Sequence, residues 1–170
     1  MRYQLTTPSP LGDLTLLGDE RALYGLWFTD QRYFGANYDL TTIPHGQTAP
    51  LRLALDWLSA YFANQAPDPF DLPLHPEVTA FRACVLQVLT QIPYGQTITY
   101  HQIATQLGQP TASRAIGGAV GHNPLSILIP CHRVVGRQGA LTGYAGGIER
   151  KIALLTLEGH DGLQWSHDHA

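Results

Sequence analysis

The sequence predicts an α+β chain of two domains, a small β-sheet domain with one helix followed by a mostly helical domain that contains a helix-turn-helix. Short runs of β-forming residues separated by turn residues occupy the first 28 positions. After residue 77, apolar residues recur at helical spacing instead. Between these regions the chain is interrupted by Pro67, Pro69, Pro73 and Pro76. We therefore place the domains at residues 1–76 and 77–170.

The composition restricts the class of protein. A chain of 170 residues can bury a core of its own, so neither of its two cysteines, Cys84 and Cys131, is needed for a disulfide framework. The polar start shows no secretory leader, and no apolar run approaches the roughly 18 residues of a membrane span. We therefore expect a cytoplasmic protein, monomeric and without a membrane partner.

The net charge of −3 is unevenly distributed along the chain. Residues 1–80 have four Arg and nine Asp or Glu, whereas residues 81–157 have five Arg and one Lys but a single Glu. A basic segment of this kind favours a nucleic-acid-binding face on the second domain. A solvated surface accounts for six cations about equally well, so the charge alone does not decide between the two.

Three strands are expected in the first domain, because apolar runs alternate there with turns that contain Pro, Gly and Asp. They cover residues 4–7, 14–17 and 22–28. Residues 30–49 are either irregular or contain a poorly marked strand. A helix over residues 50–64 should pack on the sheet, because the segment has helical spacing of Leu51, Leu55, Leu58 and Phe62.

Four helices are expected in the second domain, over residues 78–92, 100–108, 111–120 and 148–157. Cys84 lies in the first of them and is interpreted as a packing residue. Thr99 and Gln102 have the spacing of a capping box, which starts the second helix. A turn at Gln109-Pro110 joins the second and third helices. Two short helices joined in this way are typical of a helix-turn-helix, whose second helix enters a DNA groove.

The third of these helices has an unusually slender surface. Arg114 is its one prominent cation, and its small residues are Ala112, Ala115, Gly117, Gly118 and Ala119. Gly inside a helix costs about 1 kcal/mol relative to Ala. A helix with this composition is suited to close approach, either to another helix or to a groove.

A thiol lies in the middle of the apolar run over residues 127–135. Cys131 is followed by His132 and Arg133, which can stabilise a thiolate. Four roles are possible for this thiol: a packed structural cysteine, a zinc ligand, the nucleophile of a cysteine hydrolase, and an acceptor of an alkyl group. A zinc site is disfavoured because neither cysteine belongs to a C-x-x-C pair. An alkyl acceptor requires only an ionised, desolvated thiol in line with the carbon that it attacks.

The segment from Phe81 to Gly159 resembles the catalytic domain of the O6-alkylguanine-DNA alkyltransferases, also called methylated-DNA–protein-cysteine methyltransferases. Five separated segments carry this resemblance, in order: 114–119 (RAIGGA), 123–124 (NP), 127–134 (ILIPCHRV), 143–147 (GYAGG) and 158–159 (EG). Residues 1–76 resemble the family's ribonuclease-H-like supporting domain only loosely, through residues 9–12 (SPLG) and 25–28 (GLWF).

The resemblance implies direct-reversal repair of double-stranded DNA that bears O6-alkylguanine, with O4-alkylthymine as a further candidate substrate. The alkyl group would pass irreversibly from a flipped-out base to Cys131, without a cofactor and once per protein chain. His132 would remove the thiol proton through a water, and Glu158 would orient that imidazole. Asn123 would position the active-site turn, and Tyr100 would rotate the target phosphate and donate a proton to the departing guanine.

The resemblance also implies a set of DNA-binding and pocket residues. Arg114 would enter the base stack in place of the flipped base, from a helix in the minor groove. Tyr144 and the loop around Gly146 would form the wall of the pocket. The remaining DNA- or substrate-binding residues implied are Thr99, Ala115, Gly118, Arg133 and Ala145. Some relatives have serine in place of Ala145, and some bind zinc in the first domain, where this chain has no cysteine, so we expect no metal.

Three of these residues also have a plain structural interpretation. Glu158 is alternatively a solvated charge at a helix end, and Asn123 and Tyr144 are alternatively ordinary loop residues. Three rival functions remain as well. A relative that binds lesions without repairing them would lack Cys131, a redox-sensing helix-turn-helix regulator would bind specific sequences, and a cysteine hydrolase would turn over repeatedly.

Overall fold

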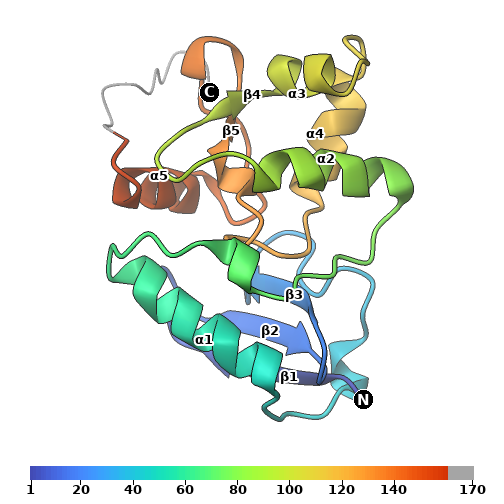
Figure 1. Cartoon of the computed structure of the whole chain (residues 1–170), viewed down its shortest axis with the longest axis vertical. Helices are drawn as coiled ribbons and strands as arrows, with labels where there is room; N and C mark the ends of the chain where they lie inside the picture. The colour runs from blue at the N-terminus through green and yellow to red at the C-terminus, as the bar shows by residue number, and fades with distance from the viewer. Residues whose placement is uncertain (161–170) are drawn as a thin grey trace. The chain divides into compact units, whose positions relative to one another are not determined.

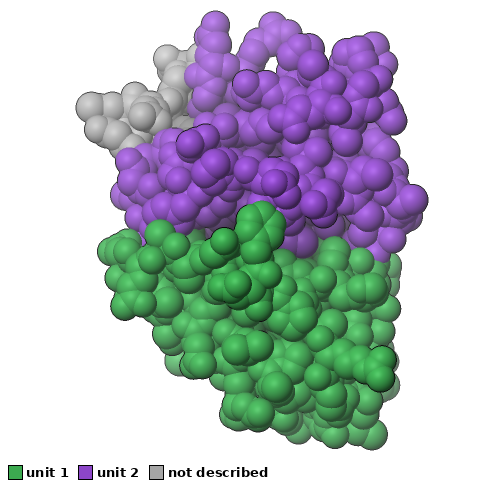
Figure 2. All heavy atoms as spheres, viewed as in Figure 1, with its two compact units in different colours: residues 1–77, 124–128 green, residues 78–123, 129–170 purple. Residues whose placement is uncertain are grey.

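The computed structural model describes residues 1–160, and these form two compact units (Figures 1 and 2). The first unit consists of Met1–Glu77 and Pro124–Leu128. The second unit consists of Val78–Asn123 and of the chain from Ile129 onward. The last ten positions of the predicted second domain, 161–170, lie outside the described residues. Within residues 1–160, no helix is long and apolar enough to cross a membrane.

The first unit is built on an antiparallel sheet in the order β1 (Tyr3–Thr7), β2 (Leu14–Gly18) and β3 (Leu23–Phe28). All three strands lie where the sequence predicts them. Every residue of β2 and β3 is buried, whereas β1 at the edge is partly exposed. Leu16 pairs with Leu5 on one side and with Leu26 on the other, which places the centre of the core on β2.

Helix α1 (Ala49–Phe62) lies across this sheet, as Figure 1 shows. The side chain of Thr48 accepts a hydrogen bond from the Leu51 amide and so caps the helix, and Pro50 suits the first turn, where no amide donor is needed. The buried face has the predicted spacing and consists of Pro50, Leu51, Ala54, Trp57, Leu58 and Tyr61. The predicted helix over residues 50–64 is confirmed.

The segment without a sequence pattern, 30–49, is irregular apart from a short 3₁₀ turn, η1 (Leu40–Thr42). Gln4 on β1 helps to hold it against the sheet, because its backbone amide donates to the Pro44 carbonyl (3.0 Å) and its backbone carbonyl accepts from the Gly46 amide (3.1 Å). The buried side-chain amide of Gln4 donates hydrogen bonds to the carbonyls of Leu40 (2.6 Å) and Ile43 (2.8 Å). A second 3₁₀ turn, η2 (Pro69–Asp71), lies in the proline-rich segment.

The second unit contains helices α2 (Ala80–Thr90), α3 (Tyr100–Gln106), α4 (Ser113–Gly121) and α5 (Ile148–Leu157). All four lie where the sequence predicts them, and both hydrogen bonds of the capping box between Thr99 and Gln102 are present. Two strands of two residues each, β4 (Ile98–Thr99) and β5 (Val134–Val135), pair in parallel. The predicted fold class, a small sheet domain followed by a mostly helical one, is confirmed.

The apolar run over residues 127–135 does not form one strand. Residues 124–128 belong to the first unit, because the amide of Leu26 donates to the Pro124 carbonyl (2.8 Å) and the amide of Ser126 donates to the Leu26 carbonyl (3.0 Å). Ile127 has a φ of 70°, which is a strained value for a β-branched residue. The run continues as the 3₁₀ turn η3 (Cys131–Arg133), then β5 and the turn η4 (Arg137–Gly139).

Candidate active site

The turn η3 carries the candidate nucleophile. It follows Pro130, and its three residues, Cys131, His132 and Arg133, are all buried. Successive side chains of a 3₁₀ turn point about 120° apart. The turn therefore sends the thiol, the imidazole and the guanidinium in three directions inside the second unit.

Two of these side chains meet at one carboxylate. Glu158 caps the C-terminus of α5, and its oxygens accept hydrogen bonds from His132 Nε2 (2.7 Å), Arg133 Nε (2.7 Å) and Arg133 Nη2 (3.1 Å). Arg133 Nη1 donates to the carbonyl of Ile92 (2.7 Å). Burial opposes ionisation of Glu158, but His132 and Arg133 outweigh it and hold the pKa of this carboxyl well below its usual range. Glu158 is therefore a carboxylate.

His132 is placed to act as a base. Its side chain is fully buried, and burial holds the pKa of the imidazole below its usual value, although Glu158 acts in the opposite direction. The ring is therefore neutral near neutral pH. Since Nε2 donates to Glu158, Nδ1 carries the free lone pair, and it has no hydrogen-bond partner among the described residues. The tautomer that Glu158 imposes leaves Nδ1 able to accept a proton.

The environment of Cys131 balances desolvation against stabilising contacts. Burial raises the pKa of the thiol, whereas hydrogen bonds from the side chains of Asn123 and Tyr144 and the positive charge of Lys151 lower it. Asn123 is itself held by a hydrogen bond from its Nδ2 to the carbonyl of Ile129 (2.8 Å). The thiol rests in a dry site with donors and a cation arranged to support its ionised form.

A second set of polar side chains lies near the thiol. The hydroxyls of Tyr100, at the start of α3, and Thr142 are 3.0 Å apart. Lys151 Nζ donates to Thr142 Oγ1 (3.1 Å) and to the Thr142 carbonyl (3.3 Å). Burial raises the pKa of Tyr100, and a negative charge on Cys131 raises it further, so the phenol stays protonated near neutral pH. Tyr100 is therefore available as a proton donor.

Comparison with known proteins assigns a family to this arrangement. Residues 80–160 match the family model described as "6-O-methylguanine DNA methyltransferase, DNA binding domain", and residues 1–76 match its "ribonuclease-like domain". The methylated-DNA–protein-cysteine methyltransferase of Mycobacterium tuberculosis is 45% identical over 93% of both chains. This chain belongs to the methylated-DNA–protein-cysteine methyltransferase family. The resemblance inferred from the sequence motifs is confirmed.

Further relatives of the methyltransferase family agree with this assignment. The Haemophilus influenzae methyltransferase is 39% identical over 92% of this chain and 86% of its own. A crystal structure of the Mycobacterium tuberculosis protein OGT in complex with DNA matches with a TM-score of 0.84 and 44% identity, over 92% of both chains. An archaeal O6-methylguanine-DNA methyltransferase from Pyrococcus kodakaraensis matches with a TM-score of 0.67 and 25% identity. Both units of this chain are covered by such matches.

Most of the residues expected to bind DNA in this methyltransferase are exposed or half-buried. Arg114 and Ala115 are exposed on α4, and a Cβ atom built on Gly118 would meet no atom within 4 Å. The Thr99 hydroxyl accepts a hydrogen bond from the Gln102 amide as a helix cap. In the loop before α5, the pocket-wall candidates Tyr144 and Ala145 are half-buried and Gly146 is buried.

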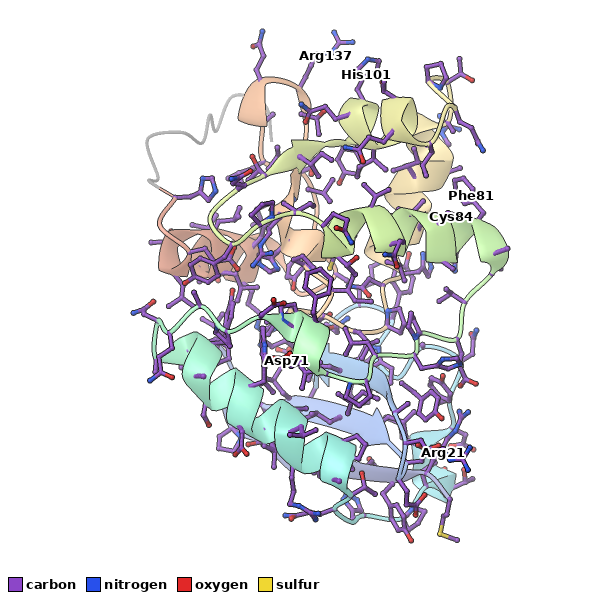
Figure 3. All side chains as sticks on the ribbon, in the orientation of Figure 1. Arg21, Asp71, Phe81, Cys84, His101 and Arg137 are labelled. Atoms are coloured by element: carbon purple, nitrogen blue, oxygen red, sulfur yellow. The ribbon has the colours of Figure 1, made fainter. Side chains whose placement is uncertain are left out.

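Arg133 is among the residues predicted to bind DNA or substrate. Its guanidinium is buried and fully engaged by Glu158 and the Ile92 carbonyl, so the geometry favours a role in holding the active site together. Lys151 is buried as well. Two of the six cations between residues 81 and 157 are therefore inside the protein. Figure 3 shows the exposed side chains of Arg137 and His101, both of which point outward.

The sequence motifs did not identify Lys151 and Thr142. Lys151 lies three and four positions before Leu154 and Leu155, on the buried face of α5. A lysine at a core position of an amphipathic helix is a signal that could have been read, because such residues are rarely buried without a specific partner. Within residues 1–160, no cluster of three His, Cys, Asp or Glu side chains could hold a metal ion.

Proposed function

We propose that this protein repairs DNA by transferring the methyl or other alkyl group of O6-alkylguanine to Cys131, irreversibly and once per chain. The observation that carries the proposal is the buried arrangement of Cys131 next to neutral His132, which Glu158 orients. Membership of the methyltransferase family supplies the substrate class.

The contacts support a defined sequence of proton and group transfers. His132 Nδ1 takes the thiol proton through a water, and Glu158 stabilises the resulting imidazolium. The thiolate attacks the alkyl carbon, a C–S bond forms, and the bond between that carbon and guanine O6 breaks. The guanine leaves with the electron pair and takes one proton, for which Tyr100 is the donor. The thioether product has no activated leaving group, so the protein is not regenerated.

DNA binding is assigned to the second unit. Helix α4 presents Arg114 and the small residues Ala115 and Gly118, which would allow close approach to the minor groove, with Thr99 at the start of α3 as a further contact. The alkylated oxygen cannot be reached inside a duplex, so the base must be extruded, at a cost of a few kcal/mol. Arg114 would fill the vacated stack.

The pocket that receives the base would be formed by the loop before α5, through Tyr144, Ala145 and Gly146. Ala145 has a small apolar side chain, which leaves room in this wall for alkyl groups larger than methyl. O4-alkylthymine is included as a further candidate substrate. We assign the protein to the cytoplasm as a monomer that needs no cofactor, and the ribonuclease-like first domain, residues 1–76, to a supporting role.

A duplex with labelled O6-methylguanine tests the proposal. The protein should take up at most one label per chain, on Cys131, as measured by scintillation counting and peptide mass spectrometry. Cys131→Ser should abolish uptake, whereas Cys84→Ser, at an exposed position on α2 (Figure 3), should leave it unchanged. Repeated turnover, or label on any other residue, would overturn the proposed function.

A further inference from the structure

Lys151 is a buried cation without a carboxylate partner among the described residues. Its side chain on α5 is only 1% exposed, and its ammonium is held by the carbonyl and hydroxyl oxygens of Thr142. Burying an ammonium group without an anion is costly, because two neutral oxygens do not replace its hydration. Arg133, the other buried cation, is paired with Glu158. The position of Lys151 therefore calls for an explanation beyond packing.

The ionisable group whose charge acts on Lys151 is Cys131. Burial lowers the pKa of Lys151 to about 8, and a negative charge on Cys131 acts in the opposite direction. The positive charge of Lys151 also acts on His132 of η3, where it adds to burial in lowering the pKa of the imidazole. The ammonium form of Lys151 is thus most stable when Cys131 is a thiolate, and it becomes more acidic once the thiolate is consumed.

A chain of hydrogen bonds leads from Lys151 to the predicted proton donor. Lys151 Nζ lies 3.1 Å from Thr142 Oγ1, and that hydroxyl lies 3.0 Å from the hydroxyl of Tyr100. Both hydroxyls can donate one hydrogen bond and accept another at the same time. A proton can therefore move from the ammonium to Thr142 while Thr142 passes its own proton to Tyr100.

We infer that Lys151 supplies, through Thr142 and Tyr100, the proton that the departing guanine takes up. This inference rests on the proposed function and deepens it. The methyl group moves to the thiolate, the guanine leaves as an anion and takes the Tyr100 proton, and the relay restores the phenol. Lys151 ends as a neutral amine beside a neutral thioether. One negative and one positive charge disappear together, so the net charge of the buried site does not change during the transfer.

The relay separates two roles that a buried lysine can have. Lys151 acts on the thiol through its charge and on the leaving group through its proton. Iodoacetamide, a small alkylating reagent, tests the first role alone, because its iodide leaving group needs no proton. Methylated duplex DNA tests both. The experiments use Cys84→Ser protein, so that Cys131 is the one cysteine that can react.

The central variant is Thr142→Val, which removes the hydroxyl and keeps the carbonyl that also holds Lys151. We expect Thr142→Val to slow methyl transfer from DNA roughly 10²-fold, the lower range of general acid–base contributions. Its reaction with iodoacetamide should stay at the rate of the parent protein, and Thr142→Ser should restore methyl transfer. Lys151→Met should slow both reactions, since it also removes the charge that supports the thiolate.

The pH dependence supplies a second readout. Because the pKa of Lys151 is about 8, the rate of methyl transfer relative to that of the iodoacetamide reaction should decline above that pH, since the charge of Lys151 affects both reactions but its proton is needed only for methyl transfer. If Thr142→Val slows both reactions equally, Thr142 has a structural role and the relay is overturned. Methyl transfer at an unchanged rate in Thr142→Val would overturn the relay as well. Failure of the proposed function is distinguishable, because the parent protein would then take no methyl group from DNA while still reacting with iodoacetamide.

Discussion

Replacing Glu158 by glutamine separates what this residue does for stability from what it does for chemistry. The substitution preserves the shape of the side chain but removes its charge, which leaves the buried guanidinium of Arg133 without an anion. Breaking a buried ion pair by removing one partner costs about 3–5 kcal/mol. We expect the free energy of unfolding of Glu158→Gln to fall by this amount.

Urea unfolding measures this loss. With a denaturant dependence of about 2 kcal/mol per M, the midpoint should fall by roughly 2 M. The double variant Glu158→Gln/Arg133→Met also removes the buried cation, and it should recover most of the lost stability, because apolar replacements of buried ion pairs are often neutral. The rate of methyl transfer, in contrast to the stability, should not recover in the double variant.

Without the carboxylate, the imidazolium that forms when His132 takes the thiol proton loses its partner, so methyl transfer should slow at least about 10²-fold in both variants. Single-turnover transfer from labelled duplex DNA gives this rate. The reasoning is refuted if the single variant loses less than about 1 kcal/mol of stability, well short of the cost of an unpaired buried charge. It is equally refuted if the double variant regains methyl transfer together with stability, since Glu158 would then act only through folding.

Four further substitutions test other parts of the structure. The pKa of Lys151 falls from 10.5 in the unfolded chain to about 8 in the folded protein, so above pH 8 the folded state binds fewer protons than the unfolded state. The free energy of unfolding of the wild type should therefore rise by about 2 kcal/mol between pH 7 and pH 9.5. Urea unfolding of Lys151→Met should not show this rise. Arg114→Ala should slow methyl transfer from a duplex more than from a single strand, where no stack has to be filled; equal slowing would contradict the flipping role. Gly118→Ala should raise the melting temperature, because alanine favours the helix by up to about 1 kcal/mol relative to glycine, yet it should weaken DNA binding in a titration. In contrast, Gly25→Ala should lower the free energy of unfolding by about 1–3 kcal/mol, because its Cβ atom would overlap the Trp27 ring at 2.0 Å.

The elements that the sequence predicted are those in which local signals and burial agree. Helix α1 has both its Thr48 cap and its apolar face in the predicted register. The pairing of β4 with β5 could not be predicted, because two residues are too short for a periodic pattern. The segment 30–49 is positioned in part by hydrogen bonds to the backbone and side chain of Gln4 on β1, a partner that no pattern within the segment can reveal.

The candidate site likewise has residues that local sequence signals identified and residues whose position depends on contacts between distant segments. The sequence motif places Cys131 and His132 next to each other, and the family resemblance pointed to Glu158, whose hydrogen bond to His132 the structure contains. The motif cannot show that Arg133 also turns inward, because its partner Glu158 lies 25 positions later and meets it only after α5 has packed. Arginine beside a reactive cysteine therefore suggested a DNA contact, and burial assigns it to the interior.

The two buried cations differ in a way that bears on why the chemistry runs once. Arg133 has a permanent anion in Glu158, so its charge is balanced before and after reaction. Lys151 is balanced by an anion only while Cys131 is a thiolate. Ionisation of the thiol thus relieves the cost of burying Lys151, which favours the reactive state, and alkylation removes that anion permanently. In the alkylated protein no anion on Cys131 opposes the effect of burial on Lys151, so its neutral amine is favoured, and the thiolate that a second transfer would need is gone.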